Sequence, residues 1–169
     1  MESLDYLTKL VSKISDLPLE DFQIEEQNKE YEGATFSLGK QTFRSRKAKR
    51  TPKKIGYFVS FWEKDTERNN QPYHSTTAPD KLVITVLDQE KSGQFVFPKK
   101  VLIKNGILRH GEVRGKMALR VYPDWIQALN KTATATQNWQ RPFFIDLTDE
   151  LDLEKLEMLY FKQADLLSK

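Results

Sequence analysis

Tyr57-Phe58-Val59-Ser60-Phe61-Trp62 is the stretch that most clearly indicates the class of fold, because five of its six residues are aromatic or β-branched. Such a run is typical of a β-strand. A second run, Leu82–Leu87, is apolar and rich in β-branched residues, which predicts a central strand buried on both faces. Trp62 alternates in phase with Phe58, so we expect its ring in the core.

Working outward, the chain reads as one domain in the order helix, strands, helix, helix. An N-terminal helix is predicted by apolar residues at helical spacing before Pro18, namely Leu4, Leu7, Val11 and Ile14. Strands are expected around Phe22 and Ile24, at Ala34–Leu38, Gln41–Arg46, Gly93–Phe97, Gly106–Leu108 and Met117–Tyr122. Further helices are expected directly after Pro98, in a long stretch from Pro123, and as an amphipathic C-terminal helix at Asp149–Leu167. We therefore expect a single α/β domain over residues 1–169, with 149–169 as a helical extension.

Charge is unevenly distributed along the chain. Residues 1–32 carry a net charge of −6, residues 33–145 carry +13, and residues 146–169 carry −4. A strongly cationic centre draws phosphates if its bases gather on one face. The alternative is that the acidic terminal helices lie across those bases and neutralise them.

The basic centre is densest between Glu32 and Glu63, where the chain has no acidic residue. Positive side chains beside flat apolar rings suit nucleic acid, which presents both phosphates and bases. A solvated loop beside a buried strand gives the same pattern. The residues that we expect to contact the phosphate backbone here are Arg44, Arg46, Lys49, Arg50, Lys53 and Lys54.

A second basic cluster follows Gly115. On a strand, Lys116 and Arg120 share one face. Arg120 lies among apolar neighbours, so it is either a buried ion-pair partner or an inward-pointing anion ligand. Thr136 and Gln137 on the following helix add hydrogen-bonding groups. These four residues form a predicted inner anion site.

Carboxylates near lysines raise an enzymatic alternative. Nucleases that hold a divalent cation place two or three carboxylates on adjacent strands near a lysine. Weak candidates for that arrangement are Glu63, Asp80, Asp88 and Lys81. Asp80 precedes its strand instead of ending it, which fits poorly, and a solvated turn is the default interpretation. No cofactor is expected, with magnesium or manganese needed only by this alternative.

Composition excludes several other classes. The chain has no cysteine, which removes disulfides, cysteine-based zinc sites and thiol nucleophiles. Its two histidines, His74 and His110, are too scattered to predict a metal site or a catalytic triad. The N-terminus has no secretory pattern and no apolar run reaches membrane-spanning length. We expect a cytoplasmic protein.

Ordered blocks of sequence resemble the MepB family of small bacterial proteins over roughly residues 22–145. They include Asn28-Lys29-Glu30-Tyr31-x-Gly33, Arg46-x-Ala48-Lys49-x-Thr51-Pro52-x-Lys54-x-Gly56, Trp62-Glu63-Lys64, Pro79-Asp80-Lys81 and Gly115-Lys116-Met117-Ala118-x-Arg120-Val121-Tyr122-Pro123. The resemblance implies a restriction-endonuclease-like fold, a mixed sheet flanked by helices, and a link to nucleic acid. It implies no established reaction.

The sequence thus predicts an α/β protein that binds nucleic acid, DNA in the first instance, mainly through phosphate contacts. The alternatives are a divalent-metal nuclease of the PD-(D/E)xK type and an adaptor whose basic face docks an acidic protein. No membrane partner is expected.

Overall fold

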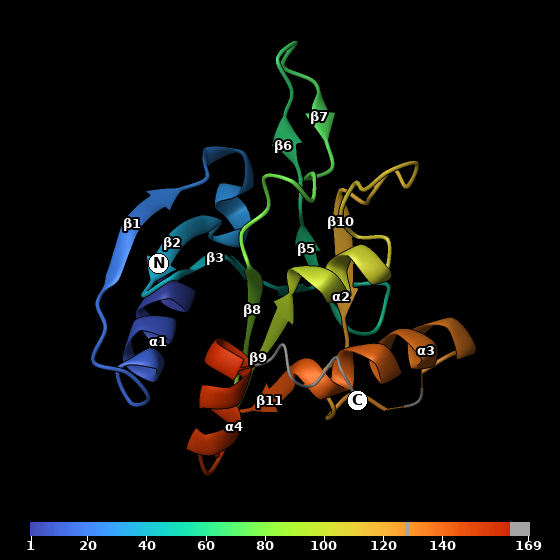
Figure 1. The fold of residues 1–169 in the computed structure, drawn as a ribbon. Helices are drawn as coiled ribbons and strands as arrows, with labels where there is room; N and C mark the ends of the chain where they lie inside the picture. The colour runs from blue at the N-terminus through green and yellow to red at the C-terminus, as the bar shows by residue number, and fades with distance from the viewer. Residues whose placement is uncertain (128, 163–169) are drawn as a thin grey trace.

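A six-stranded mixed sheet forms the centre of the computed structural model, which describes residues 1–127 and 129–162 (Figure 1). The strand order is β1-β2-β3-β8-β9-β11, and all neighbours are antiparallel except β3 and β8, which are parallel. The strands are β1 (Leu19–Ile24), β2 (Ala34–Leu38), β3 (Gln41–Lys47), β8 (Lys81–Asp88), β9 (Lys91–Pro98) and β11 (Phe144–Asp146). The predicted mixed sheet flanked by helices is therefore confirmed.

The central strand β8 explains why the core has two sides. Successive side chains of a strand point to opposite faces, so Leu82, Ile84 and Val86 enter one apolar cluster while Val83 enters the other. Helices α1 (Glu2–Val11) and α4 (Leu153–Glu157), with the π-helical turn η3 (Met158–Lys162), cover the second cluster. Apolar burial on both faces fixes the register of the whole sheet.

The first cluster is covered by a smaller antiparallel sheet with the order β10-β5-β4. Its strands are β4 (Lys49–Arg50), β5 (Tyr57–Ser60) and β10 (Ala118–Val121). The helices α2 (Lys99–Lys104) and α3 (Lys131–Gln140) lie on the same side of the molecule (Figure 1). This small sheet presents its inner side chains to the core and its outer side chains to solvent.

Three short elements complete the described fold. A short β-hairpin, formed by β6 (Glu63–Lys64) and β7 (Asn70–Gln71), extends away from the two sheets (Figure 1). The 3-10 segment η1 (Glu26–Tyr31) connects β1 to β2, and η2 (Arg141–Phe143) connects α3 to β11. Within residues 1–127 and 129–162, no helix combines the length and the apolar character needed to cross a membrane.

Several sequence-based boundaries are wrong. Gly106–Leu108 forms turns and an irregular segment, not a strand. The helix expected from Pro123 begins only at Lys131, after Asn130 caps it by accepting a hydrogen bond from the Ala133 amide. The C-terminal helix begins at Leu153 with Asp152 as its cap, not at Asp149. The part of its predicted range beyond Lys162 lies outside the described residues.

The orientation of the strand β5 also differs from the prediction. Tyr57 and Val59 face the core, and the following Phe61 is also buried, whereas Phe58 is only half-buried on the outer face. Trp62 is likewise half-buried and lies outside both core clusters. Both faces of this strand are apolar, so alternation alone does not say which one is covered.

Candidate functional site

The outer face of the small sheet brings together residues that are far apart in the sequence. In the strand register, Phe58 is paired with Lys49 on one side and with Arg120 on the other. The guanidinium carbon of Arg120 lies 5.9 Å from the centre of the Phe58 ring. A row of cation, aromatic ring and cation therefore crosses the three strands, at right angles to the chain direction.

Arg120 also fixes the loop that joins β4 to β5. Its Nη1 donates to the Ile55 carbonyl oxygen at 3.1 Å, and its Nη2 donates to the Thr51 hydroxyl. Gly56 ends this loop at a φ of +93°, and a Cβ there would lie 2.6 Å from the Tyr122 ring. Within the described part of the chain Arg120 has no carboxylate partner and is half-exposed, so it is not a buried ion-pair partner.

Two cavities lie on either side of Arg120. The larger has a volume of ≈ 470 Å³, and its lining residues are Tyr31, Thr51, Pro52, Lys53, Lys54, Phe58 and Arg120. The smaller, of ≈ 190 Å³, is lined by Lys116, Arg120, Thr136 and Trp139 among others. Arg120 is common to both, so the cavity beside Lys53 and Lys54 adjoins the one that contains Lys116 and Thr136 of the predicted inner anion site.

Lys49 belongs to the same surface through Tyr31. Its ammonium nitrogen lies 4.8 Å from the centre of the Tyr31 ring, and that ring meets Phe58 edge to face with 5.9 Å between ring centres. The exposed side chains Lys53, Lys54 and Lys116 complete the set. We refer to Tyr31, Lys49, Lys53, Lys54, Phe58, Lys116 and Arg120 as the outer-sheet surface.

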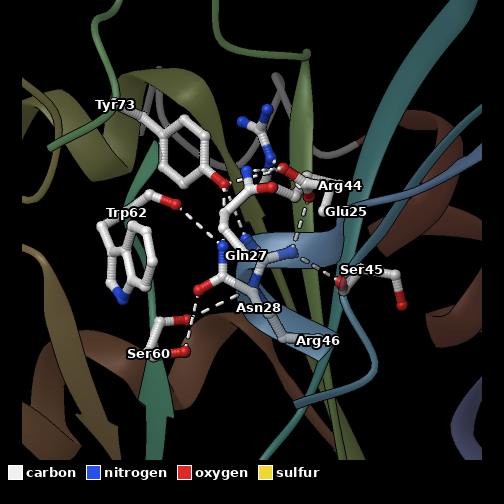
Figure 2. Close-up of polar contacts among 9 residues, drawn as sticks. All are labelled: Glu25, Gln27, Asn28, Arg44, Ser45, Arg46, Ser60, Trp62 and Tyr73. Carbon is white, nitrogen blue, oxygen red and sulfur yellow. Dashed lines mark hydrogen bonds and ion pairs between the residues drawn. The ribbon is translucent and has the colours of Figure 1, made fainter. Parts of the chain in front are cut away.

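A buried polar network holds this surface in place. Arg46 is 0% exposed, and its Nη1 donates to Glu25 Oε1 at 2.7 Å while its Nη2 donates to the Tyr73 hydroxyl at 2.7 Å (Figure 2). The Tyr73 hydroxyl in turn donates to Glu25 Oε2 at 2.7 Å. Arg44 completes the network: its Nε donates to Glu25 at 3.0 Å, and its guanidinium lies 3.7 Å from the centre of the Tyr73 ring. Each buried charge is therefore paired.

The network continues to the segment that carries Tyr31. The side-chain Nδ2 of Asn28 donates to the Trp62 carbonyl oxygen at 2.8 Å, and the Ser60 hydroxyl donates to Asn28 Oδ1 at 2.8 Å (Figure 2). Gly33 leaves room for this arrangement, since a Cβ there would lie 2.9 Å from Arg46 Nη1. Because Asn28 anchors η1 against β5, the ring of Tyr31 is held beside Phe58 in an edge-to-face contact.

The pKa of Glu25 reflects its two arginine neighbours. Burial by itself raises this pKa, but the charges of Arg46 and Arg44 and the hydrogen bonds from Arg46 and Tyr73 outweigh burial, so the pKa lies below its usual value. A carboxyl whose pKa is lower in the folded than in the unfolded chain stabilises the fold above its unfolded pKa. That stabilisation disappears as the pH falls through the folded pKa.

Glu25→Gln should therefore lower the free energy of unfolding at neutral pH, and its deficit relative to the unmodified chain should shrink as the pH falls below about 4. Urea unfolding at a series of pH values measures the two curves. Glu26→Gln is the matched control, because Glu26 is exposed and, among the residues that the structure describes, its only ion pair is with Lys29 at 3.9 Å. A deficit of Glu25→Gln that stays constant with pH would contradict the ion-pair account.

The comparisons with known proteins agree with the resemblance to the MepB family that the sequence indicates. The model of the MepB-like family matches residues 25–146, which run from Glu25 of the network to the end of β11. The chain belongs to the MepB-like family. The crystal structure of MepB is similar over 89% of this chain and 99% of that one, with 44% identity and a TM-score of 0.78. No curated protein sequence matches.

A bacterial homing endonuclease is also similar to this MepB-like chain, but at 17% identity and a TM-score of 0.44, over 80% of this chain and 84% of that one. A likeness of this size does not transfer an activity.

Two of the six phosphate contacts predicted in the first basic stretch, those of Arg44 and Arg46, are wrong. Arg46 is fully buried and Arg44 is mostly buried, and both are bound to Glu25. Arg50 remains exposed, with an ion pair to Asp88 at 3.5 Å. Lys49, Lys53 and Lys54 stay exposed on the outer-sheet surface. The two buried arginines face Glu25 and Tyr73 because β3 places them on the side that η1 covers.

In the inner cluster, Thr136 lines the smaller cavity with Lys116, but Gln137 does not. Gln137 is buried, and its side-chain Nε2 donates to the carbonyl oxygens of Pro123 and Ile126. It therefore supports the irregular segment before α3. The prediction that Gln137 faces an anion is wrong.

The candidate nuclease residues do not form one site. Asp80 and Asp88 lie beside opposite ends of the eight-residue strand β8, roughly 25 Å apart at the usual rise of a strand. Asp80 accepts hydrogen bonds from Thr42, and Glu63 lies in the separate hairpin and accepts one from Gln71. Among the described residues no cluster of three His, Cys, Asp or Glu side chains is arranged to hold a metal ion.

Lys81 has a structural role that sequence reasoning missed. Its ammonium is buried and donates to the carbonyl oxygens of Leu159 at 2.9 Å and Tyr160 at 2.5 Å. Burial lowers the pKa of Lys81 to about 8, against the opposing charge of Asp80. This lysine therefore ties β8 to the turn η3.

Proposed function

We propose that this MepB-like chain binds nucleic acid through the outer-sheet surface. The observation that supports this best is that five cations share one side of the small sheet, and none of them forms an ion pair within residues 1–127 and 129–162. They are Lys49, Lys53, Lys54, Lys116 and Arg120.

Several bases elsewhere in the described chain are compensated, although others there, such as Lys40, Lys99 and Lys100, also form no ion pair. Arg44 and Arg46 are held by Glu25, Lys47 by Glu2 and Glu32, and Arg141 by Asp124. The terminal acids therefore neutralise some bases of the centre, but not those of the outer-sheet surface. A group of uncompensated cations favours a polyanion, because binding releases the counterions condensed on the phosphates.

The chemistry of the surface suits phosphate diesters in particular. Arg120 is half-exposed, and its guanidinium has five N–H groups, of which two are used by the bonds to Ile55 and Thr51 and the others can donate to phosphate oxygens. The lysines act as mobile point charges around it. The Thr136 hydroxyl, which already donates to the Thr132 carbonyl oxygen at 3.2 Å, lies in the smaller cavity and contributes a polar wall.

Equilibrium binding to short fluorescent oligonucleotides at increasing salt tests this function. If the five cations contact phosphates, the logarithm of the binding constant should fall linearly against the logarithm of salt concentration, with a slope of about −3.5 to −4.5. An affinity that does not depend on salt, or no binding even at low salt, would overturn the proposal. Polyglutamate of the same charge should bind much more weakly; equal binding would favour an adaptor for acidic proteins instead.

A further inference from the structure

We infer that the ligand of the outer-sheet surface is single-stranded nucleic acid, with one unpaired base held against Phe58 and Tyr31. The inference rests on the proposed function and adds the class of nucleic acid to it. It follows from the aromatic part of the surface, which phosphate contacts alone do not explain.

The two rings form a platform between the cations. Phe58 is half-buried on the outer face although its strand neighbours Tyr57 and Val59 are fully covered. Tyr31 stands edge-on to it, and Lys49 and Arg120 lie on either side. A flat base that packs on Phe58 would therefore have positive charge within reach of the phosphates on both sides of its own sugar.

The cavity beside the rings has the dimensions of a small-ligand site. At ≈ 470 Å³ it falls within the range of pockets that enclose a ligand of nucleotide size. One wall is the Thr51–Lys54 segment, in which Pro52 restricts the backbone and Lys53 and Lys54 are exposed. The lining therefore combines two aromatic rings with three cations, which are the groups that a base with its phosphate requires.

A duplex cannot place the face of a base in this cavity. In a double helix the faces of the bases are covered by their neighbours, so only phosphates and groove edges reach a protein surface. In a single strand the faces are free to stack on aromatic side chains. The smaller cavity with Lys116, on the other side of Arg120, offers the next phosphate of the same strand a contact.

The test compares Phe58→Ala with the unmodified chain on a single strand and a duplex of equal length at one salt concentration. We expect the variant to lose about tenfold or more in affinity for the single strand and less than about twofold for the duplex. A 2-aminopurine base in the single strand should lose fluorescence on binding the unmodified chain and keep it with the variant.

Phe22→Ala is the matched control, since Phe22 is 48% exposed on β1 and lies outside the surface. It should bind both probes as the unmodified chain does. Tyr31→Ala serves in place of Phe58→Ala if thermal melting shows that the latter is unfolded. The inference is overturned if both probes bind and neither substitution separates them. If neither probe binds the unmodified chain, the proposed function itself fails.

Discussion

Arg46→Met should lower the free energy of unfolding by about 3–5 kcal/mol, the cost typical of leaving one partner of a buried ion pair without the other. Arg46 is 0% exposed and supplies hydrogen bonds to Glu25, Tyr73 and two backbone carbonyl oxygens. Methionine fills much of the volume but leaves Glu25 with only Arg44 as a cationic partner. Equilibrium urea unfolding at neutral pH measures the loss.

Two further variants separate the ion pair from general packing. Arg50→Met is the control, because Arg50 has 71% of its side chain exposed and its pair with Asp88 is worth no more than about 1 kcal/mol. Adding Glu25→Gln to Arg46→Met should restore part of the stability, because it removes the unpaired buried charge. If Arg46→Met and Arg50→Met cost the same, the network does not hold the fold together.

The second large effect is expected on binding. Reversing three exposed lysines of the outer-sheet surface together, Lys49→Glu, Lys54→Glu and Lys116→Glu, should lower affinity for oligonucleotides by about 100-fold or more at low salt, since three contacts become repulsive. No described hydrogen bond or ion pair depends on these three ammonium groups, so the fold should be retained. Thermal melting checks this.

The matched control changes the net charge by the same amount elsewhere. Lys9, Lys13 and Lys40 are also exposed, on α1, in the turn after it and in the turn between β2 and β3. Reversing them to Glu should weaken binding by less than about fivefold, through long-range charge alone. An equal loss in both triple variants would show that overall charge, and not this surface, determines binding.

The charge pattern predicted part of the surface for a physical reason. Lys49, Lys53 and Lys54 lie on a short strand and a loop, and long charged side chains there stay in solvent unless something covers them. Arg44 and Arg46 belong to the same basic run, but their partners Glu25 and Tyr73 come from distant segments. One sequence gives no signal for that pairing, so burial of the two arginines was not predictable.

The same limit applies to the aromatic residues. The β5 run correctly predicted a strand, and the Leu82–Leu87 run correctly predicted the central one. Alternation did not identify Phe58 as the outward ring, because both faces of β5 are apolar and the covering elements are remote in sequence. The sequence around Tyr31 indicates a family resemblance but not a role for its ring. Its role depends on Asn28, which anchors η1 through Ser60 and Trp62.

The salt dependence of binding, measured side by side for the unmodified chain and for a variant with Lys49→Gln, Lys54→Gln and Lys116→Gln, tests the central claim most directly. If these ammonium groups neutralise phosphates, the slope of the logarithmic plot should become shallower by about 2 to 3 in the variant. Two parallel lines would contradict the account, because they would mean that no phosphate contact was lost.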